Sequence, residues 1–318
     1  MKVKFGFVLR VLGTVGGLVF IATRVNLDDA KGAFGRIPLA VFAAAIALVA
    51  LNVVAGAVRW RVLLRAYGAT AIPSMGRLVF LYFVSFFYNN YLPGAVAGDV
   101  GRGVVTRDAF AEEGAAGSLA VVLVERALGL FGLFALLAAG IVLAGDALDT
   151  RALWWWTLLG SAGSCALVAG IAVARRIARF LPRIIRQHAE KLPSVHDHGA
   201  FAFALLLSVV TQMLIALAGW VILAALGPID LASSLLVVPL AAATAFLPIT
   251  VGGAGAREAV YVALCGALFG MHEADALAAS LSLWFAHLVV GLGGGVAQLV
   301  MRPRTKRRGR DHGVAVGD

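Results

Sequence analysis

The length of its apolar runs constrains this chain more than any other feature. Residues 115–144 are apolar or small apart from Ser118 and one adjacent charged pair, Glu125 and Arg126. A helix crosses a bilayer with about 20 mainly apolar residues. Of the 318 residues, 61% are apolar and 14% charged, whereas soluble domains have about 45–50% apolar and about 25% charged residues. A soluble enzyme, a disordered chain and a secreted disulfide scaffold are therefore excluded.

Six full transmembrane helices are predicted from these runs, at residues 6–23, 37–58, 115–144, 154–174, 201–226 and 277–301. Basic side chains gather at the N-terminus and in three further stretches: Arg59 to Arg77, Arg175 to Lys191 and Arg302 to Arg310. Because basic loops face the cytoplasm, we expect a multi-pass protein of the cell membrane with both termini cytoplasmic. The excess of 27 Lys and Arg over 17 Asp and Glu then has a membrane explanation, and we expect no nucleic-acid partner.

Two apolar segments, 78–102 and 235–269, are too broken to cross the membrane simply. Proline removes a backbone donor and glycine frees the backbone, so each helix should break at mid-membrane depth. Irregular backbone at that depth is tolerated only inside protein or along a wet cavity. The residues expected to act as gates or backbone ligands are Pro93, Gly94, Gly98, Pro248, Gly252, Gly253 and Gly255.

The two broken segments resemble each other in their spacing. In each, a Leu-Pro pair is followed by glycine five residues after the proline and by arginine nine residues after it. Three full crossings separate the copies, so the segments should enter from opposite sides, as in inverted-repeat transporters. The predicted organisation is an all-α polytopic membrane protein of two halves, 1–150 and 151–301, with a basic cytoplasmic tail at 302–318.

Six charged side chains fall at apparent membrane depth: Asp99, Arg102, Glu125, Arg126, Arg257 and Glu258. Each costs about 2.5–3.5 kcal/mol on insertion scales, so they should pair or face a polar cavity. Neighbours on a helix do not face each other, so Glu125 and Arg126 should pair elsewhere. We expect Asp99 to pair with Arg126, and Glu125 to pair with Arg102 or Arg257.

These charges have two interpretations, a structural tie between helices or a polar cleft that binds phosphate. Arginine suits phosphate because its planar guanidinium grips two oxygens at once. No nucleophile–base pair, nucleotide-binding loop or metal motif accompanies the six charges. We therefore expect no catalytic residue, no metal and no cofactor. Cys165 and Cys265 lie in apolar runs, and the glycines of 291–295 favour close helix packing.

Four groups of residues resemble the lysylphosphatidylglycerol synthase transmembrane-region family, the flippase-like module of the multiple peptide resistance factor. They are Asn52 with Arg59-Trp60-Arg61 and Leu64; Asn89 with Leu92-Pro93-Gly94, Gly98-Asp99 and Arg102; Glu125-Arg126 with Gly129; and Pro248 with Gly252-Gly253, Gly255 and Arg257-Glu258. Together they extend over roughly residues 50–300. Two departures stand out: Ala97 replaces the usual first glycine of a Gly-Gly-Asp triplet, and the soluble aminoacyl-transferase domain is expected to be missing.

The resemblance implies a lipid flippase or scramblase that moves a polar-headed, phosphate-containing lipid between leaflets without a chemical step. Asn89 and the six intramembrane charges would bind the headgroup, with the arginines on the phosphate. The resemblance does not specify the lipid and leaves three alternatives: another phospholipid, a polyprenyl-phosphate-linked glycan or a hopanoid-type lipid. Two alternatives are a non-transporting scaffold for a separate lipid-modifying enzyme and a membrane transferase using Asp99 or Glu258 as a base. The sequence also leaves open whether the protein forms a homo-oligomer.

Overall fold

The computed structural model describes residues 27–92, 96–145, 151–177, 192–246 and 253–301, with the single positions 15, 16, 19, 23, 180 and 186. Every regular element in this part of the chain is a helix. Five helices are long and apolar enough to cross a membrane: α3 (Leu39–Ala66), α6 (Gly114–Ala144), α7 (Arg151–Ile177), α9 (His198–Leu226) and α12 (Glu273–Val300). The predicted polytopic all-α class is confirmed, and the predicted span 6–23 lies almost wholly outside the described residues.

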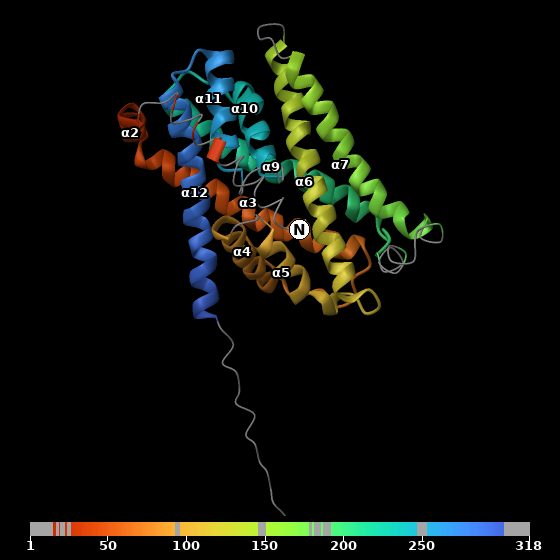
Figure 1. The fold of residues 1–318 in the computed structure, drawn as a ribbon. Coiled ribbons are helices and arrows are strands. Elements are labelled where there is room, and N and C mark those ends of the chain that lie inside the picture. Colours follow the sequence, from red (N-terminus) through yellow and green to blue (C-terminus); the bar gives the residue numbers. More distant parts are fainter. Residues whose placement is uncertain are drawn as a thin grey trace, which may run out of the picture.

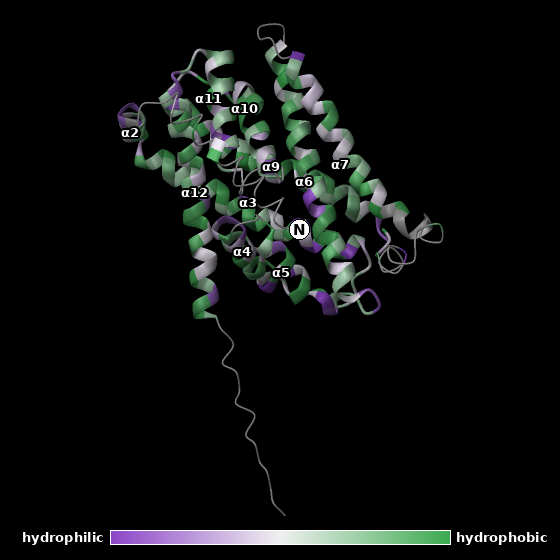
Figure 2. Ribbon diagram, viewed as in Figure 1, coloured by the Kyte–Doolittle hydropathy of each residue, from purple (hydrophilic) through white to green (hydrophobic). Residues whose placement is uncertain are grey.

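Figure 2 shows how hydropathy is distributed over these helices. Apolar residues cover most of α3, α6, α9 and α12, and hydrophilic residues gather at connections, on the short helix α2 (Leu27–Arg36) and within α6. A hydrophilic patch inside an otherwise apolar helix must be covered by other protein groups, because lipid cannot hydrogen-bond to it.

The end of α3 corrects the prediction that its span stops at residue 58. The helix continues to Ala66, because nothing between Arg59 and Leu64 breaks it and these residue types favour helices. Arg59 is 6% exposed and therefore belongs to the interior of the bundle, not to a cytoplasmic loop.

Both predicted breaks are present. The chain leaves α4 (Met75–Tyr91) and resumes in α5 (Ala97–Val105). The second interruption separates α10 (Leu231–Ala243) and the short 3-10 helix η4 (Thr244–Phe246) from α11 (Ala256–Phe269). Pro93, Gly94, Pro248 and Gly252 lie outside the described residues.

The order of elements recurs, since α3-α4-α5-α6 and α9-α10-α11-α12 each place two short helices between two long ones. Packing is reciprocal: α3 lies along α9, α4 packs against α12, and α10 packs against α6. In Figure 1, α4 and α5 lie toward the end of the bundle where α12 finishes, and α10 and α11 lie toward the opposite end. The residue boundaries of two halves, and the side facing the cytoplasm, stay predictions.

Glycines permit the closest of these contacts. A methyl group built on Gly294 of α12 would overlap the Phe83 carbonyl oxygen of α4, and one on Gly98 would overlap the Ser85 carbonyl oxygen. Gly291 and Gly295 also face α4, through Tyr91 and Phe87, so the glycine run 291–295 does bring two helices together.

Candidate functional site

Asp99, on the short helix α5, joins two arginines. One carboxylate oxygen accepts hydrogen bonds from Ser85 Oγ at 2.8 Å and Arg102 Nε at 2.9 Å. The other accepts from Arg126 Nε and faces Arg126 Nη2, both at 2.6 Å. The predicted pair of Asp99 with Arg126 is therefore confirmed.

Glu125 of α6 is the next charged group in this line of ion pairs, after Arg102. Arg102 Nη2 lies 2.7 Å from one carboxylate oxygen, which confirms one of the two pairings expected for Glu125. The other oxygen accepts hydrogen bonds from Arg59 Nη2 at 3.0 Å and from the Tyr82 hydroxyl at 2.8 Å. At 1% exposure, Glu125 is one of the most deeply buried charged groups described.

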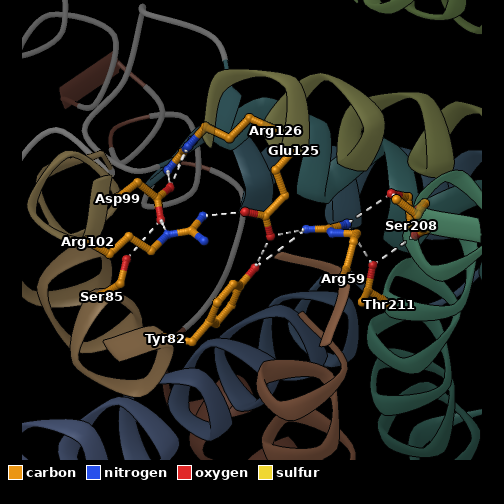
Figure 3. A network of polar contacts seen from close by, with 10 residues as sticks. Arg59, Tyr82, Ser85, Asp99, Arg102, Glu125, Arg126, Ser208 and Thr211 are labelled. Atoms are coloured by element: carbon orange, nitrogen blue, oxygen red, sulfur yellow. Dashed lines mark hydrogen bonds and ion pairs between the residues drawn. The ribbon is translucent and has the colours of Figure 1, made fainter. Parts of the chain in front are cut away.

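Arg59 ends this sequence of charges on the α9 side. Its Nη1 donates to Ser208 Oγ at 3.3 Å and to Thr211 Oγ1 at 3.1 Å. Figure 3 shows the alternating order, called here the ionic row: Arg126, Asp99, Arg102, Glu125 and Arg59. The row connects α3, α5 and α6, and its contacts reach α4 and α9.

The role of Arg59 was missed from the sequence, which counted it with the cytoplasmic basic residues. Two signals pointed to it: the helical pattern continues without a breaker past residue 58, and Arg59-Trp60-Arg61 belongs to the family-like motif. Its partner Glu125 is distant in sequence and could be identified only from the fold.

Arg102 is enclosed on several sides. Its guanidinium carbon lies 4.6 Å from the ring centroid of Trp60 and 4.5 Å from that of Tyr82, in cation–π geometry. With Asp99 and Glu125 as ion partners and 4% exposure, it holds the ionic row together. It also lines a small cavity of about 290 Å³ beside Ser85.

The second broken segment has a separate ion pair. Glu258 accepts hydrogen bonds from the backbone N–H of Gly255 at 2.7 Å and from Arg257 Nε at 2.9 Å. The alternative pairing of Glu125 with Arg257 is therefore wrong. In the first turn of α11, Glu258 folds back to cap the helix, and this brings its carboxylate within reach of the neighbouring arginine. Ser280 Oγ also donates to Glu258, at 3.5 Å.

Glycine is required around this turn. Gly253 and Gly255 have φ values of 83° and 82°, which L-residues with side chains rarely adopt. In the first break, the backbone N–H of Gly98 donates to Asn89 Oδ1 at 2.9 Å. The side chain of Asn89 thus connects the end of α4 to the start of α5.

The charges of the site do not balance. The sequence predicted three carboxylates and three arginines, whereas the structure adds Arg59 as a fourth arginine. The ionic row begins and ends with arginine, and the second pair is neutral. Among these seven described groups there is one more positive than negative charge.

A cavity of about 610 Å³ lies between the two broken segments. It reaches Asn89 and Leu92 at the first break and Gly253 and Arg257 at the second. Its described lining contains two arginines, Arg126 and Arg257, and no carboxylate. Arg126 lies 5.8 Å from the Phe246 ring and Arg257 lies 5.7 Å from the Trp284 ring.

The lining divides the predicted site residues into two sets. Asn89, Arg126, Arg257 and Gly253 face the large cavity. The other set forms ion pairs with arginines and consists of Asp99, Glu125 and Glu258. Arg102 lies inside the ionic row. Whether any of them binds substrate or acts as a gate stays a prediction.

Fold and site define a polytopic membrane protein with broken helices around a cavity lined by polar and apolar side chains. Residues 7–295 match the model of the family described as the lysylphosphatidylglycerol synthase TM region, so the chain belongs to that family. No curated protein matches the chain.

Proposed function

We propose that this protein moves a phosphate-bearing lipid between the leaflets of the cell membrane, as a flippase or scramblase without a chemical step. The observation that carries the proposal is the 610 Å³ cavity between the two helix breaks, with Arg126 and Arg257 on its wall. A volume of this order suits a small ligand or a lipid headgroup. Apolar lining residues such as Leu92 and Ile215 suit the start of the acyl chains.

The two arginines on the cavity wall support an anionic ligand. Arg59, at one end of the ionic row, is buried and bonded to the hydroxyls of Ser208 and Thr211. Arg126, at the other end, has a side chain that is 25% exposed and lies on the cavity wall. A phosphodiester at this end of the row would meet a guanidinium that faces the cavity.

The arginines then have two roles. Arg126 and Arg257 contact the phosphate. Arg102 positions Asp99, which in turn orients Arg126, and Arg59 and Arg102 together hold Glu125. This assignment narrows the sequence-based expectation, in which Arg102 also touched phosphate. The recurring order of elements and their reciprocal packing support a cavity that opens alternately to the two leaflets.

Leaflet exchange in liposomes tests the proposal. Purified protein would be reconstituted with tail-labelled phosphatidylglycerol, and outer-leaflet label would be quenched with dithionite over time. We expect the wild type to expose inner-leaflet label and the Arg126→Gln/Arg257→Gln variant to lose this activity. Arg77→Gln, at an arginine outside the large cavity, is the matched control. Equal exchange in all three proteins would refute the assignment of the cavity.

A scaffold for a lipid-modifying enzyme is the second candidate, favoured by the buried ion pairs that Arg59, Arg102, Glu125 and Asp99 form with one another. In that case these groups serve stability alone. No wild-type exchange with any labelled lipid, together with co-purification of a lipid-modifying enzyme, would support the scaffold against the transporter.

A further inference from the structure

The large cavity carries a second chemical signature besides its two arginines. Four carboxamide side chains line it: Asn52 of α3, Asn89 and Asn90 of α4, and Gln212 of α9. Aromatic rings of Trp284 and Phe246 lie beside the arginines. Carboxamides are neutral groups that both donate and accept hydrogen bonds.

From this lining, and resting on the proposed transport function, we infer that the headgroup is a phosphate carrying a neutral polyhydroxylated group, a sugar or polyol, and not an amine. Hydroxyls need both donors and acceptors, which the carboxamides supply. An ammonium group would instead meet two guanidiniums with no carboxylate in the described lining. Like charges brought together in a desolvated site disfavour such a ligand.

The two asparagines of α4 show how a hydroxyl would be held. Asn89 uses its carbonyl oxygen to accept the Gly98 N–H, which leaves its NH₂ group as the donor. Asn90 uses its NH₂ group to donate to the Phe86 carbonyl oxygen at 2.8 Å, which leaves its own oxygen as the acceptor. Adjacent residues thus offer one donor and one acceptor, the pair that a sugar hydroxyl requires.

The nearest carboxylates do not change this conclusion. Asp99 contacts Arg126, Arg102 and Ser85, and Glu258 contacts Arg257 and the α11 N-terminus. Recruiting either one to an amine would break an ion pair that holds a cavity arginine in place.

Binding in detergent tests the headgroup independently of transport. The full chain would be offered lipids singly and in competition, with bound lipid counted by native mass spectrometry. The phosphate-polyol probes are phosphatidylinositol and a polyprenyl-phosphate glucose, which also distinguish a glycerolipid from a polyprenyl source. Phosphatidic acid lacks the polyol, glucosylceramide lacks the phosphate, and lysylphosphatidylglycerol adds amines.

We expect at least one phosphate-polyol lipid to bind more tightly than the other three probes. Removing one or two hydrogen bonds with Asn52→Leu/Gln212→Leu should weaken its binding about five-fold or more and leave phosphatidic acid unchanged. Gln298→Leu, outside the large cavity, is the matched control. Asn52→Asp should raise the relative binding of lysylphosphatidylglycerol.

The inference is overturned if lysylphosphatidylglycerol binds the wild type as tightly as the polyol lipids, if the carboxamide variant keeps the wild-type preference, or if no probe binds. A monodisperse elution profile for each variant separates loss of binding from loss of folding. Preference without leaflet exchange would refute transport and keep the headgroup assignment. Leaflet exchange without a headgroup preference would support transport and refute the headgroup assignment.

Discussion

Glu125 lies between Arg102 and Arg59, and its two carboxylate oxygens face guanidiniums from two different helices, at 2.7 Å and 3.0 Å. The carboxylate on α6 therefore joins α5 to α3 in the interior of the bundle. Neither arginine can remain buried at low cost without it, because an unpaired charge in an apolar interior is strongly destabilising.

Replacing Glu125 with glutamine should therefore destabilise the fold. The change preserves shape but removes the negative charge between two arginines, so we expect a loss of about 3–5 kcal/mol in the free energy of unfolding. Denaturant unfolding in detergent measures it. Glu112→Gln, at an exposed residue, is the control and should change stability by no more than about 0.5 kcal/mol. An unchanged unfolding midpoint for Glu125→Gln would contradict the structural role of this ion pair.

Substitutions of Arg102 and Arg126 should affect different properties, the first mainly stability and the second mainly transport. Arg102→Gln leaves Glu125 and Asp99 short of a buried partner, so its main effect should be a loss of stability of about 3–5 kcal/mol. Arg126→Gln changes a partly exposed group on the cavity wall and should mainly reduce leaflet exchange. Thermal unfolding and the dithionite assay, applied to both variants, would reveal the difference. If the two variants behave alike in both measurements, the division between positioning and contact residues is wrong.

Gly98 should not tolerate a methyl group. An alanine there would overlap the Ser85 carbonyl oxygen and push α5 away from α4, at a cost of about 1–3 kcal/mol or more. Gly101 lies on the same helix and has open space around its Cβ position, so Gly101→Ala is the matched control and should be nearly neutral. The melting temperatures of the two variants measure the difference. Equal values would contradict the close contact between α5 and α4.

Gly294 makes the corresponding test for α12. Alanine at this position would overlap the Phe83 carbonyl oxygen and separate α12 from α4, with a loss of about 1–3 kcal/mol. Gly293→Ala, one residue earlier, faces open space and should leave stability unchanged or raise it by up to about 1 kcal/mol, because alanine favours a helix more than glycine does. A Gly294→Ala protein as stable as Gly293→Ala would show that the two helices are not in close contact.

Much of the architecture could be predicted from the sequence because its causes are local. Long apolar runs require a membrane, and four of the five long described helices match the predicted spans to within a few residues at each end. Proline and glycine near residues 93 and 248 indicated the breaks, because proline removes a backbone donor and glycine frees the backbone. The pair of Asp99 with Arg126 followed from counting charges that lipid cannot accommodate.

Only the tertiary structure decided which arginines line the cavity and which lie in the ionic row. Arg59 was assigned to a loop until helix packing placed it opposite Glu125, and Arg257 found its partner in the adjacent Glu258 because that carboxylate folds back to cap α11. The pair of Arg59 with Glu125 depends on the distance between α3 and α6, whose residues are far apart in sequence, whereas the pair of Arg257 with Glu258 depends on the backbone of one helix turn. Residue types at given spacings determine membrane depth and helix breaks, but the ion pairs between helices and the set of side chains that line the cavity arise only when the helices pack.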